Sequence, residues 1–392
     1  MLVPKLRFKR ENGTNYPEWE EDTIGNCVNV TSCKRVHQSD WTDSGVPFYR
    51  AREIVALYNN EPITPLHISI EKYNALSKIS GMISSGDLLV TGVGTIGVPY
   101  LVKESDKFYF KDGNIIWFQN EEKRALGSFL YYTLSTNEFQ TKILQDSGKG
   151  TVHTFTIANA KETIIAIPCL EEQQKIANFL STVDEVIVQS EAEVQNFEQQ
   201  KKAAMQKIFS QKVRFKREDG TDYPGWEEKV FTDLFKSIPN KDYQVQTKEY
   251  KPNGKYRIID QSQSFIAGYS DLESKVCYQN PCIIFGDHTT ILKYVDFPFI
   301  VGADGVKTLI TNDCYVAKYC FYLLGFNNVK PTGYNRHYSK LKELTLLCST
   351  DIEEQQKIAN FLSAYDEAIA YAKQELDKWK ELKKGLLQQM FV

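Results

Sequence analysis

The sequence predicts an α+β fold in which two mixed α/β domains are separated by two long helices. We expect the helices to form an antiparallel coiled coil and the halves of the chain to be related as a pseudo-twofold repeat. Three observations predict this architecture. Two motifs each occur twice, one of them opens a long heptad pattern in both copies, and the stretches between the motifs contain many short strand-like runs.

Both internal repeats are close to identical in the 392-residue chain. The first begins at Leu6 as LRFKRENGTNYPEWEE and returns at Val213 as VRFKREDGTDYPGWEE, with 12 of 16 positions matching. The second begins at Glu171 as EEQQKIANFLSTVDEVI and returns at Glu353 as EEQQKIANFLSAYDEAI, with 14 of 17 matching. The repeats divide the chain into four segments, which are a domain at 1–170, a constant helix at 171–212, a domain at 213–352 and a constant helix at 353–392.

The constant segments have the pattern of long amphipathic helices. Their apolar positions recur at steps of three and four, which is the spacing of a heptad seam, and neither segment contains proline. A rod of about 40 residues is about 60 Å long and needs a partner to cover its apolar stripe. The order of the repeats predicts that each helix pairs antiparallel with its own copy, and that the N-terminus follows on from the C-terminus. The predicted seam consists of Ile176, Phe179, Val183, Val194, Phe197, Ile208, Ile358, Phe361, Tyr365, Leu376, Trp379 and Leu386.

The two globular blocks are predicted to be mixed α/β. In the first block we expect β-structure at 87–102, 113–118 and 162–168, and a helix at 122–136. In the second block we expect a helix at 316–325 and strands at 256–260, 281–286, 291–301 and 306–310.

A glycine pattern in the first block resembles a dinucleotide-binding loop, but its context differs. Gly92, Gly94 and Gly97 spell G-x-G-x-x-G after an apolar run. Such a site needs a helix to begin at the loop, so that the helix N-terminus faces the pyrophosphate. The residues that follow, Val98 to Val102, have an extended pattern. We therefore predict a tight β-turn here and no nucleotide site.

Composition and motifs favour binding without catalysis. No P-loop and no H-E-x-x-H motif occurs, the five histidines form no triad pattern, and Asn280-Pro281-Cys282 lacks the rest of a methyltransferase tetrapeptide. The eight cysteines form no C-x-x-C pair, so we expect reduced thiols and no metal site. No run of about 18 apolar residues and no signal-peptide core are present, which predicts a cytoplasmic protein.

The net charge of −3 predicts that any DNA contact depends on local clusters of basic residues or on partner proteins. Residues 1–170 hold 18 basic and 19 acidic side chains, and residues 213–352 hold 18 and 17. Both blocks are thus close to neutral.

Several of these runs together carry a family resemblance. The EEQQKIANFLS start of each constant helix and the Y-P-x-W-E-E motif before each block are similar to specificity subunits of type I restriction-modification systems. Within the blocks, ISSGDLLVTGVGTIG and FIVGADGVKTL resemble parts of target recognition domains. The resemblance covers essentially the whole chain.

The resemblance implies a non-catalytic reader of double-stranded DNA. Each target recognition domain is expected to read one half of a split sequence in the major groove, and the coiled coil to fix the gap between the halves. Two modification subunits are expected to dock on the chain and methylate adenine with S-adenosylmethionine. Restriction subunits are expected to add an ATP- and Mg-dependent translocase and nuclease, so this chain itself needs no cofactor and no membrane.

Candidate DNA-reading residues are basic, amide or hydroxyl side chains in polar loops, since these groups read base edges and hold phosphates. Segments SGKGTVHT and PTGYNRHYS occupy matching places before the last strand of each block, which makes them our best pair of recognition loops. The candidates in the first block are Lys34, Arg35, His37, Arg50, Arg52, Lys149, Thr151 and His153. Those in the second block are Arg257, Gln261, Gln263, Ser264, His288, Thr289, Thr290, Lys307, Asn335, Arg336 and His337.

Two other classes of function stay open at this point. The first is a DNA methyltransferase or nuclease with unusual motifs, which S-adenosylmethionine binding by the chain alone would favour. The second is a scaffold that uses the coiled coil for assembly and does not read DNA. Failure to bind a modification subunit would favour the scaffold.

Overall fold

The fold is described from a computed structural model. The structure describes residues 4–111, 113–120, 124–146, 154–333 and 335–392. The chain forms two compact units, of which unit 1 comprises residues 1–190 and 375–392 and unit 2 comprises residues 191–374. Each unit holds one globular domain together with part of both long helices.

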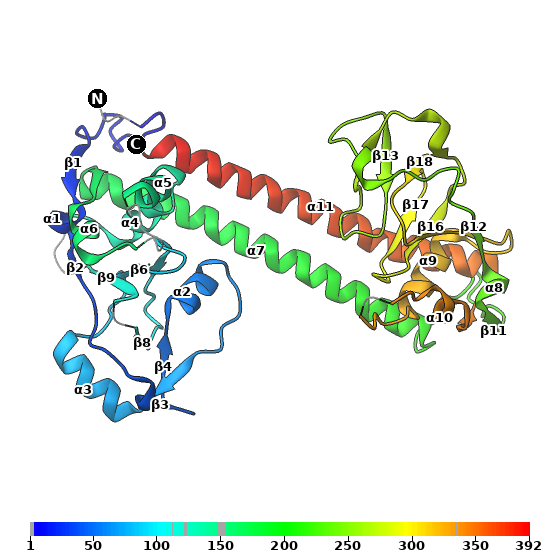
Figure 1. The fold of residues 1–392 in the computed structure, drawn as a ribbon, viewed down its shortest axis with the longest axis horizontal. Coiled ribbons are helices and arrows are strands. Elements are labelled where there is room, and N and C mark those ends of the chain that lie inside the picture. The colour runs from blue at the N-terminus through cyan, green and yellow to red at the C-terminus, as the bar shows by residue number, and fades with distance from the viewer. Residues whose placement is uncertain (1–3, 112, 121–123, 147–153, 334) are drawn as a thin grey trace. The chain divides into compact units, whose positions relative to one another are not determined.

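The two long helices are α7 (Leu170–Phe209) and α11 (Ile352–Met390), as the heptad pattern predicted. Within each unit their segments run antiparallel, side by side (Figure 1). In unit 1, Lys383 Nζ lies 2.6 Å from Asp184 Oδ1. In unit 2, Lys373 Nζ lies 2.7 Å from Glu198 Oε1. The antiparallel coiled coil and the repeat architecture expected from the sequence are confirmed.

Most predicted seam residues are covered, but two are not seam residues. The covered residues include Ile176, Val183, Val194, Ile208 and Ile358, which are buried, and Phe197, Tyr365, Leu376, Trp379 and Leu386, which are half-buried. Phe179 and Phe361 are 39% and 40% exposed.

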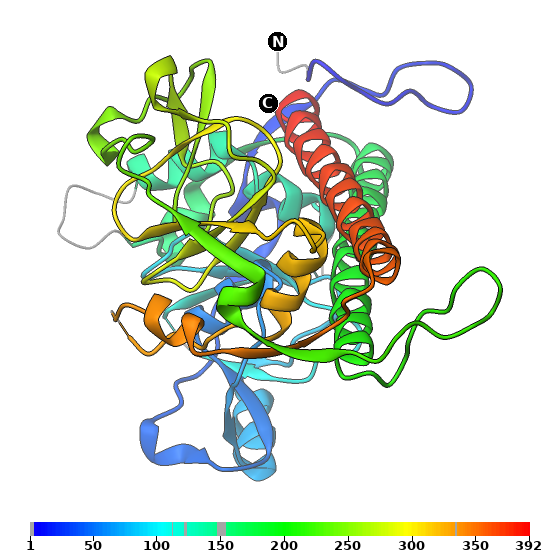
Figure 2. The same cartoon turned by 90° about the vertical axis from the view of Figure 1, so that its right-hand side faces the viewer.

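The prediction for these two phenylalanines was wrong because each packs on the hairpin that opens the domain of its unit, around the bridge Lys9–Asn15 in unit 1 and Lys216–Asp222 in unit 2. Their rings lie 5.6 Å from Phe8 and 5.5 Å from Phe215, edge to face. The neighbouring Leu180 and Leu362 are fully buried instead. Both hairpins extend away from the strands and are seen in blue and green in Figure 2.

The N-terminus does follow on from the C-terminus in unit 1. The backbone N–H of Leu6 donates to the carbonyl of Gln389, at the end of α11. In unit 2 the equivalent bond runs from Val213 to Lys207, where the chain is continuous. The hairpin that opens the first domain is therefore attached to α11 as the second hairpin is attached to α7.

The ends of the long helices also belong to the domain cores. Met390 and Phe391 are buried in unit 1, where Trp19 packs edge to face on Phe129 and Phe391 at 5.8 and 6.4 Å. Ile208 and Phe209 are buried in the core of unit 2 in the same way. Burying these apolar ends fixes each helix on the domain at which it finishes.

The two domains share one sheet topology although their sequences differ. Each has a four-stranded antiparallel sheet, ordered β2-β9-β6-β7 in unit 1 and β12-β19-β16-β17 in unit 2. The unit 1 strands are β2 (Asn29–Thr31), β9 (Ile115–Gln119), β6 (Leu88–Thr91) and β7 (Pro99–Leu101). The unit 2 strands are β12 (Phe235–Ile238), β19 (Val306–Thr311), β16 (Cys282–Gly286) and β17 (Leu292–Val295).

A second sheet in each domain combines antiparallel and parallel pairs. In unit 1 the order is β3-β5-β4-β8 and in unit 2 it is β14-β13-β18-β15, and the pairs β4–β8 and β13–β18 are parallel. The strands are β3 (Trp41–Thr42), β4 (Val46–Tyr49), β5 (Leu66–Ile68), β8 (Tyr109–Phe110), β13 (Tyr256–Ile259), β14 (Gly268–Ser270), β15 (Val276–Cys277) and β18 (Phe299–Val301). A two-stranded sheet leads into each long helix, from β1 (Glu20–Thr23) with β10 (Ile164–Ile167) and from β11 (Glu227–Val230) with β20 (Thr345–Cys348).

Short helices cover the sheets. One helix in each domain packs on the first sheet and on the start of the long helix, namely α4 (Gly127–Leu134) in unit 1 and α9 (Ala317–Phe326) in unit 2. The remaining helices are α1 (Ile24–Cys27), α2 (Ala51–Tyr58), α3 (Ile70–Ser80), α5 (Asn137–Asp146), α6 (Ile157–Glu162), α8 (Phe231–Leu234) and α10 (Tyr338–Lys342).

The glycine pattern forms a turn, as predicted. The loop between β6 and β7 connects antiparallel neighbours, and the N–H of Gly97 donates to the carbonyl of Thr91. Gly94 and Gly97 have φ angles of +79° and +78°, which side chains other than glycine adopt only with strain. No helix begins at this loop, so it lacks the helix terminus on which a dinucleotide site depends.

Candidate functional site

Three loops of the second domain meet at one edge of its sheets. Strands β13 and β18 are parallel, so the segments that follow them, from Asp260 and from Gly302, leave on the same side. The loop after β16 joins them, because the N–H of Asp287 donates to the carbonyl of Gly305 at 2.6 Å. The arrangement gathers polar loop residues that are far apart in the sequence.

Gln261 ties these three loops together. Its Oε1 accepts a hydrogen bond from the N–H of His288 at 3.2 Å, and its Nε2 donates to the carbonyl of Asp304 at 2.9 Å. Its own carbonyl accepts a bond from Thr289 Oγ1 at 2.9 Å. The amide of Gln261 is thus already occupied, and this candidate base reader positions the loops in the free chain.

A buried lysine binds the backbone of the loop that follows β13. Lys293, on β17, is 4% exposed, and its Nζ donates to the carbonyls of Asp260 and Ser264 at 2.7 and 2.6 Å. Burial lowers the pKa of Lys293. Lys293 was missed from the sequence, although the alternation of β17 places it on the same inward face as Val295.

Asp287 and His337 anchor the predicted recognition loop PTGYNRHYS. Asp287 Oδ1 accepts hydrogen bonds from the N–H groups of His337 and Tyr338 at 2.8 and 2.7 Å. His337 Nε2 accepts a bond from the N–H of Thr332 at 2.9 Å. His337 is fully buried, so its assignment as a DNA contact is corrected to that of a positioning residue.

Only some of the candidate DNA-reading residues of the second domain have exposed side chains in the described structure. Gln263, Ser264, Thr289, Asn335 and Arg336 are exposed on these loops. Thr290 is buried, so its side chain is not accessible to DNA in this conformation, and its backbone carbonyl accepts a bond from Asn328. His288 and Lys307 are half-buried, and Arg257 is exposed with its guanidinium 4.7 Å from the Phe297 ring centre.

Replacing Asp287 by alanine is expected to loosen the recognition loop of the second domain. The change leaves the N–H of the half-buried Tyr338 without its side-chain acceptor, which costs about 1–3 kcal/mol in the free energy of unfolding. We expect weaker binding at the half-site read by this domain and none at the other. Urea unfolding and methylation of separately mutated half-sites measure both effects, and the exposed Asp313→Ala variant is the control. Unchanged stability would contradict the anchoring role.

The first domain repeats the same backbone connections. The N–H of Gly92 donates to the carbonyl of Asn114 at 2.8 Å, and the N–H of Phe155 donates to the carbonyl of Gly92 at 2.9 Å. These bonds match those of Asp287 with Gly305 and of His337 with Asp287. Phe155 is therefore attached at the place that His337 takes in the second domain, whereas the candidates Lys149, Thr151 and His153 lie outside the described residues.

The other candidates of the first domain divide into paired and exposed groups. Arg50 and Arg52 both bind the buried carboxylate of Glu53, at 2.7 Å for the shortest contact of each. Arg52 remains 68% exposed, whereas Arg50 is 22% exposed. Lys34, Arg35 and His37 are exposed on the segment after β2. DNA contact by any of these residues stays a prediction.

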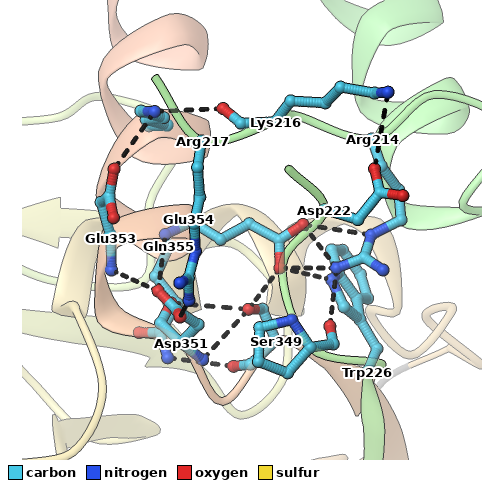
Figure 3. Close-up of polar contacts among 12 residues, drawn as sticks. Arg214, Lys216, Arg217, Asp222, Trp226, Ser349, Asp351, Glu353, Glu354 and Gln355 are labelled. Carbon is cyan, nitrogen blue, oxygen red and sulfur yellow. Dashed lines mark hydrogen bonds and ion pairs between the residues drawn. The ribbon is translucent and has the colours of Figure 1, made fainter. Parts of the chain in front are cut away.

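A second arrangement is repeated in both units, where the hairpin that opens a domain meets the start of the long helix that follows that domain. Figure 3 shows the copy in unit 2. In unit 2 the guanidinium of Arg214 binds both oxygens of Glu354, at 2.9 and 3.0 Å from Nη2. Trp226 Nε1 and Ser349 Oγ donate to the same carboxylate at 2.9 and 2.6 Å. Glu354 is fully buried, so these donors replace the water that its charge has lost.

Unit 1 repeats this arrangement with fewer donors. Arg7 binds both oxygens of the buried Glu172, at 2.9 Å from Nε and 2.7 Å from Nη2. The bonds to Glu172 raise the pKa of Arg7. The neighbouring Gln173 accepts a bond from the N–H of Leu126, as Gln355 does from Val316. The sequence did not single out Arg7, Glu172 or Gln173 as site residues, although their identity in both repeats was a usable signal.

Exposed apolar side chains also recur at equivalent positions of the two repeats. Leu6 and Val213 are 41% and 51% exposed, and Leu170 and Ile352 are 42% and 48% exposed. Together with Phe179 and Phe361 they give each unit three exposed apolar side chains, at its hairpin and in the first part of its long helix, and each set of three is termed an apolar patch. Exposed apolar side chains that gather on one surface mark protein-interaction sites, whereas single ones are normal.

All eight cysteines lie in the described part of the chain, none of them forms a disulfide, and six are buried. Burial raises the pKa of Cys27 and of Cys348 to about 11, so both thiols stay protonated at neutral pH. In the part of the chain that the structure describes, no three His, Cys, Asp or Glu side chains gather where they could hold a metal ion. None of the helices in that part is long and apolar enough to cross a membrane.

Comparison with known proteins gives consistent matches. A profile of the type I restriction modification DNA specificity domain matches residues 16–196 and 223–381. A putative type I restriction enzyme specificity subunit of Haemophilus influenzae is 28% identical over 178 residues, or 45% of this chain and 43% of the relative. The MjaVIII specificity subunit of Methanocaldococcus jannaschii is 24% identical over 223 residues, or 53% and 50%. The chain thus matches about half the length of these curated relatives.

Solved structures share the fold along the whole chain. The S subunit of a type I restriction-modification system from M. genitalium matches with a TM-score of 0.65 at 15% identity, covering 100% of this chain and 99% of that one. A chain from a structural study of complex assembly in the type I R-M system matches with a TM-score of 0.52 at 14% identity, covering 96% and 98%.

Proposed function

Since the chain belongs to the family of type I restriction-modification DNA specificity subunits, we propose that it binds a bipartite DNA target, with one half-site read by each recognition domain. The observation that carries this proposal is the pair of domains with one sheet topology and different loop residues. Shared strands give both domains one way of approaching DNA, whereas different side chains in the loops read different bases.

In the second domain, the exposed side chains between the anchored loop ends contact the bases. Gln263, Thr289, Asn335 and Arg336 are polar and accessible, and Gln261, Lys293, Asp287 and His337 hold their backbone. A recognition surface needs this rigidity because hydrogen bonds to base edges tolerate only small displacements.

The helix pair sets the gap between the half-sites. A helix of 40 residues such as α7 is about 60 Å long. This length corresponds to at most about 18 base pairs at 3.4 Å each. A change of one heptad alters the reach by about 10 Å, or about three base pairs.

The chain itself carries out no chemistry in this proposal. Two modification subunits methylate adenine with S-adenosylmethionine, and restriction subunits supply the ATP- and Mg-dependent translocase and nuclease. The near-neutral blocks support this division, because firm DNA binding then depends on positive charge from the partners. Binding of S-adenosylmethionine by the purified chain, measured by calorimetry, would instead favour an enzyme.

The repeated apolar patches are the docking sites of the two modification subunits. A lysine at Leu170 places a charge in one patch, so the variant is expected to bind one modification subunit where the unchanged chain binds two. The double variant Leu170→Lys/Ile352→Lys is expected to bind none. Mass photometry counts the subunits, and Ile79→Lys, at a 66% exposed site outside the repeats, is the control. Two subunits on the double variant would exclude these patches.

A further inference from the structure

Each unit contains the same three-residue contact between its recognition domain and both long helices. In unit 1, Tyr132 of α4 donates to Asp184 Oδ2 of α7 at 2.9 Å, and Lys383 of α11 binds Asp184 Oδ1 at 2.6 Å. In unit 2, Tyr322 of α9 donates to Asp366 Oδ2 of α11, and Lys201 of α7 binds Asp366 Oδ1.

The two triads are equivalent residue by residue. Asp184 and Asp366, like Lys201 and Lys383, are 182 positions apart, which is the offset of the helix repeat. In both units the lysine also lies near the tyrosine ring, with Nζ 5.9 Å from the ring centre of Tyr132 and 5.0 Å from that of Tyr322. The tyrosines belong to the dissimilar parts of the two domains, so their recurrence at one place points to a shared task.

The same antiparallel register of α7 against α11 brings the aspartate and the lysine of each triad together. On α7 Lys201 follows Asp184 by 17 residues, and on α11 Lys383 follows Asp366 by 17 residues. A slip of one heptad in one direction places Asp184 opposite Leu376 and Asp366 opposite Val194. The slipped pairing leaves half-buried charges facing apolar side chains, which is the way polar seam residues select a register in coiled coils.

The triads hold each domain helix at a second point. The first turn of α4 is already attached to α7 through Leu126 and Gln173, and that of α9 to α11 through Val316 and Gln355. The tyrosine lies six residues further along in both helices. Two attachment points prevent the domain from turning about the first one.

We propose that the Tyr–Asp–Lys triads are positioning residues that fix how each recognition domain is oriented on the helix pair, and thereby the gap allowed between the half-sites. The inference rests on the proposed function. One added base pair moves the second half-site by about 3.4 Å and turns it by about 35° around the DNA axis. Only domains with a fixed orientation can reject such a neighbouring gap.

The test uses the full chain together with its modification subunit and plasmids in which the two half-sites stand at the native gap or at one base pair more or less. Removing both hydroxyls with Tyr132→Phe/Tyr322→Phe leaves the ring packing in place. We expect the preference for the native gap to fall about 10-fold or more, since each lost bond goes to a charged acceptor, while both half-site sequences stay the same. Glu198→Gln is the control, because it removes a helix-to-helix ion pair that involves no recognition domain.

Substitutions at the lysine provide a second arm that leaves both tyrosines in place. Lys201→Asp is expected to lose the gap preference, whereas Lys201→Arg, which keeps a positive charge beside Asp366, is expected to retain it. A gap preference within twofold of the unchanged chain in both the Phe variant and Lys201→Asp overturns the inference. Absence of any gapped methylation by the unchanged chain overturns the proposed function instead, so the two failures are distinguishable.

Discussion

Replacing Arg336 by alanine is expected to abolish recognition at one half-site while leaving the fold intact. Arg336 is exposed and lies one residue before the buried His337, so its backbone is anchored and its side chain is accessible. Loss of an arginine that reads a base costs about 1–3 kcal/mol of discrimination, or about 5- to 150-fold in binding at that position. Fluorescence anisotropy of the complex with specific and half-scrambled DNA measures the loss.

Arg336→Lys separates base reading from charge. Lysine keeps the positive charge but not the planar, two-pronged donor, so it is expected to keep binding to unrelated DNA and to lose the preference for the specific half-site. The melting temperature of both variants is expected to match that of the unchanged chain. Unchanged affinity of Arg336→Ala for specific DNA would exclude this residue as a reader.

Replacing Arg7 by methionine is expected to destabilise unit 1 by about 3–5 kcal/mol, which is the usual cost of leaving a buried charge without its partner. The same change at Arg214 is expected to cost less. Glu354 keeps the donors Ser349 and Trp226, whereas the side-chain donor described for Glu172 is Arg7. Calorimetric unfolding of the two variants measures the difference between the repeats.

Arg10→Met is the control for the loss of a positive charge near the same helix start. Its guanidinium lies 3.9 Å from Glu171 and 5.3 Å from the ring centre of Tyr16, and the side chains of Arg10 and Glu171 are 43% and 72% exposed. Exposed ion pairs contribute about 0–1 kcal/mol, so this variant is expected to unfold almost as the unchanged chain does. A larger loss at Arg214 than at Arg7 would contradict the explanation by remaining donors.

The repeats made the architecture predictable, because long amphipathic patterns and near-identical motifs depend on local sequence. The bounds of α7 and α11 and the turn at Gly94 and Gly97 follow from such local signals. Phe179 and Phe361 were misassigned because a heptad pattern does not reveal that a distant hairpin covers the same side chain. Contact with residues remote in the sequence decided whether each phenylalanine packs in the helix seam or on the hairpin.

The candidate site was harder to predict for the same reason. Polar composition selected loops of the second domain that the structure brings together, but it did not separate exposed side chains from positioning residues. Gln261 and His337 have the side chains of base readers, yet their polar atoms bind other loops. Lys293 and Asp287 became visible only when strands from distant parts of the sequence came together.

The most direct measurement is the methylome of a methylation-free host that expresses this chain with the modification subunit of its own operon. The account predicts one split motif with a fixed gap, methylated at adenine on both strands. The two halves of this motif are the half-site sequences that the two domains recognise. A soluble complex that adds no methylation, or methylation at a continuous motif without a gap, would contradict the assignment of one half-site to each domain.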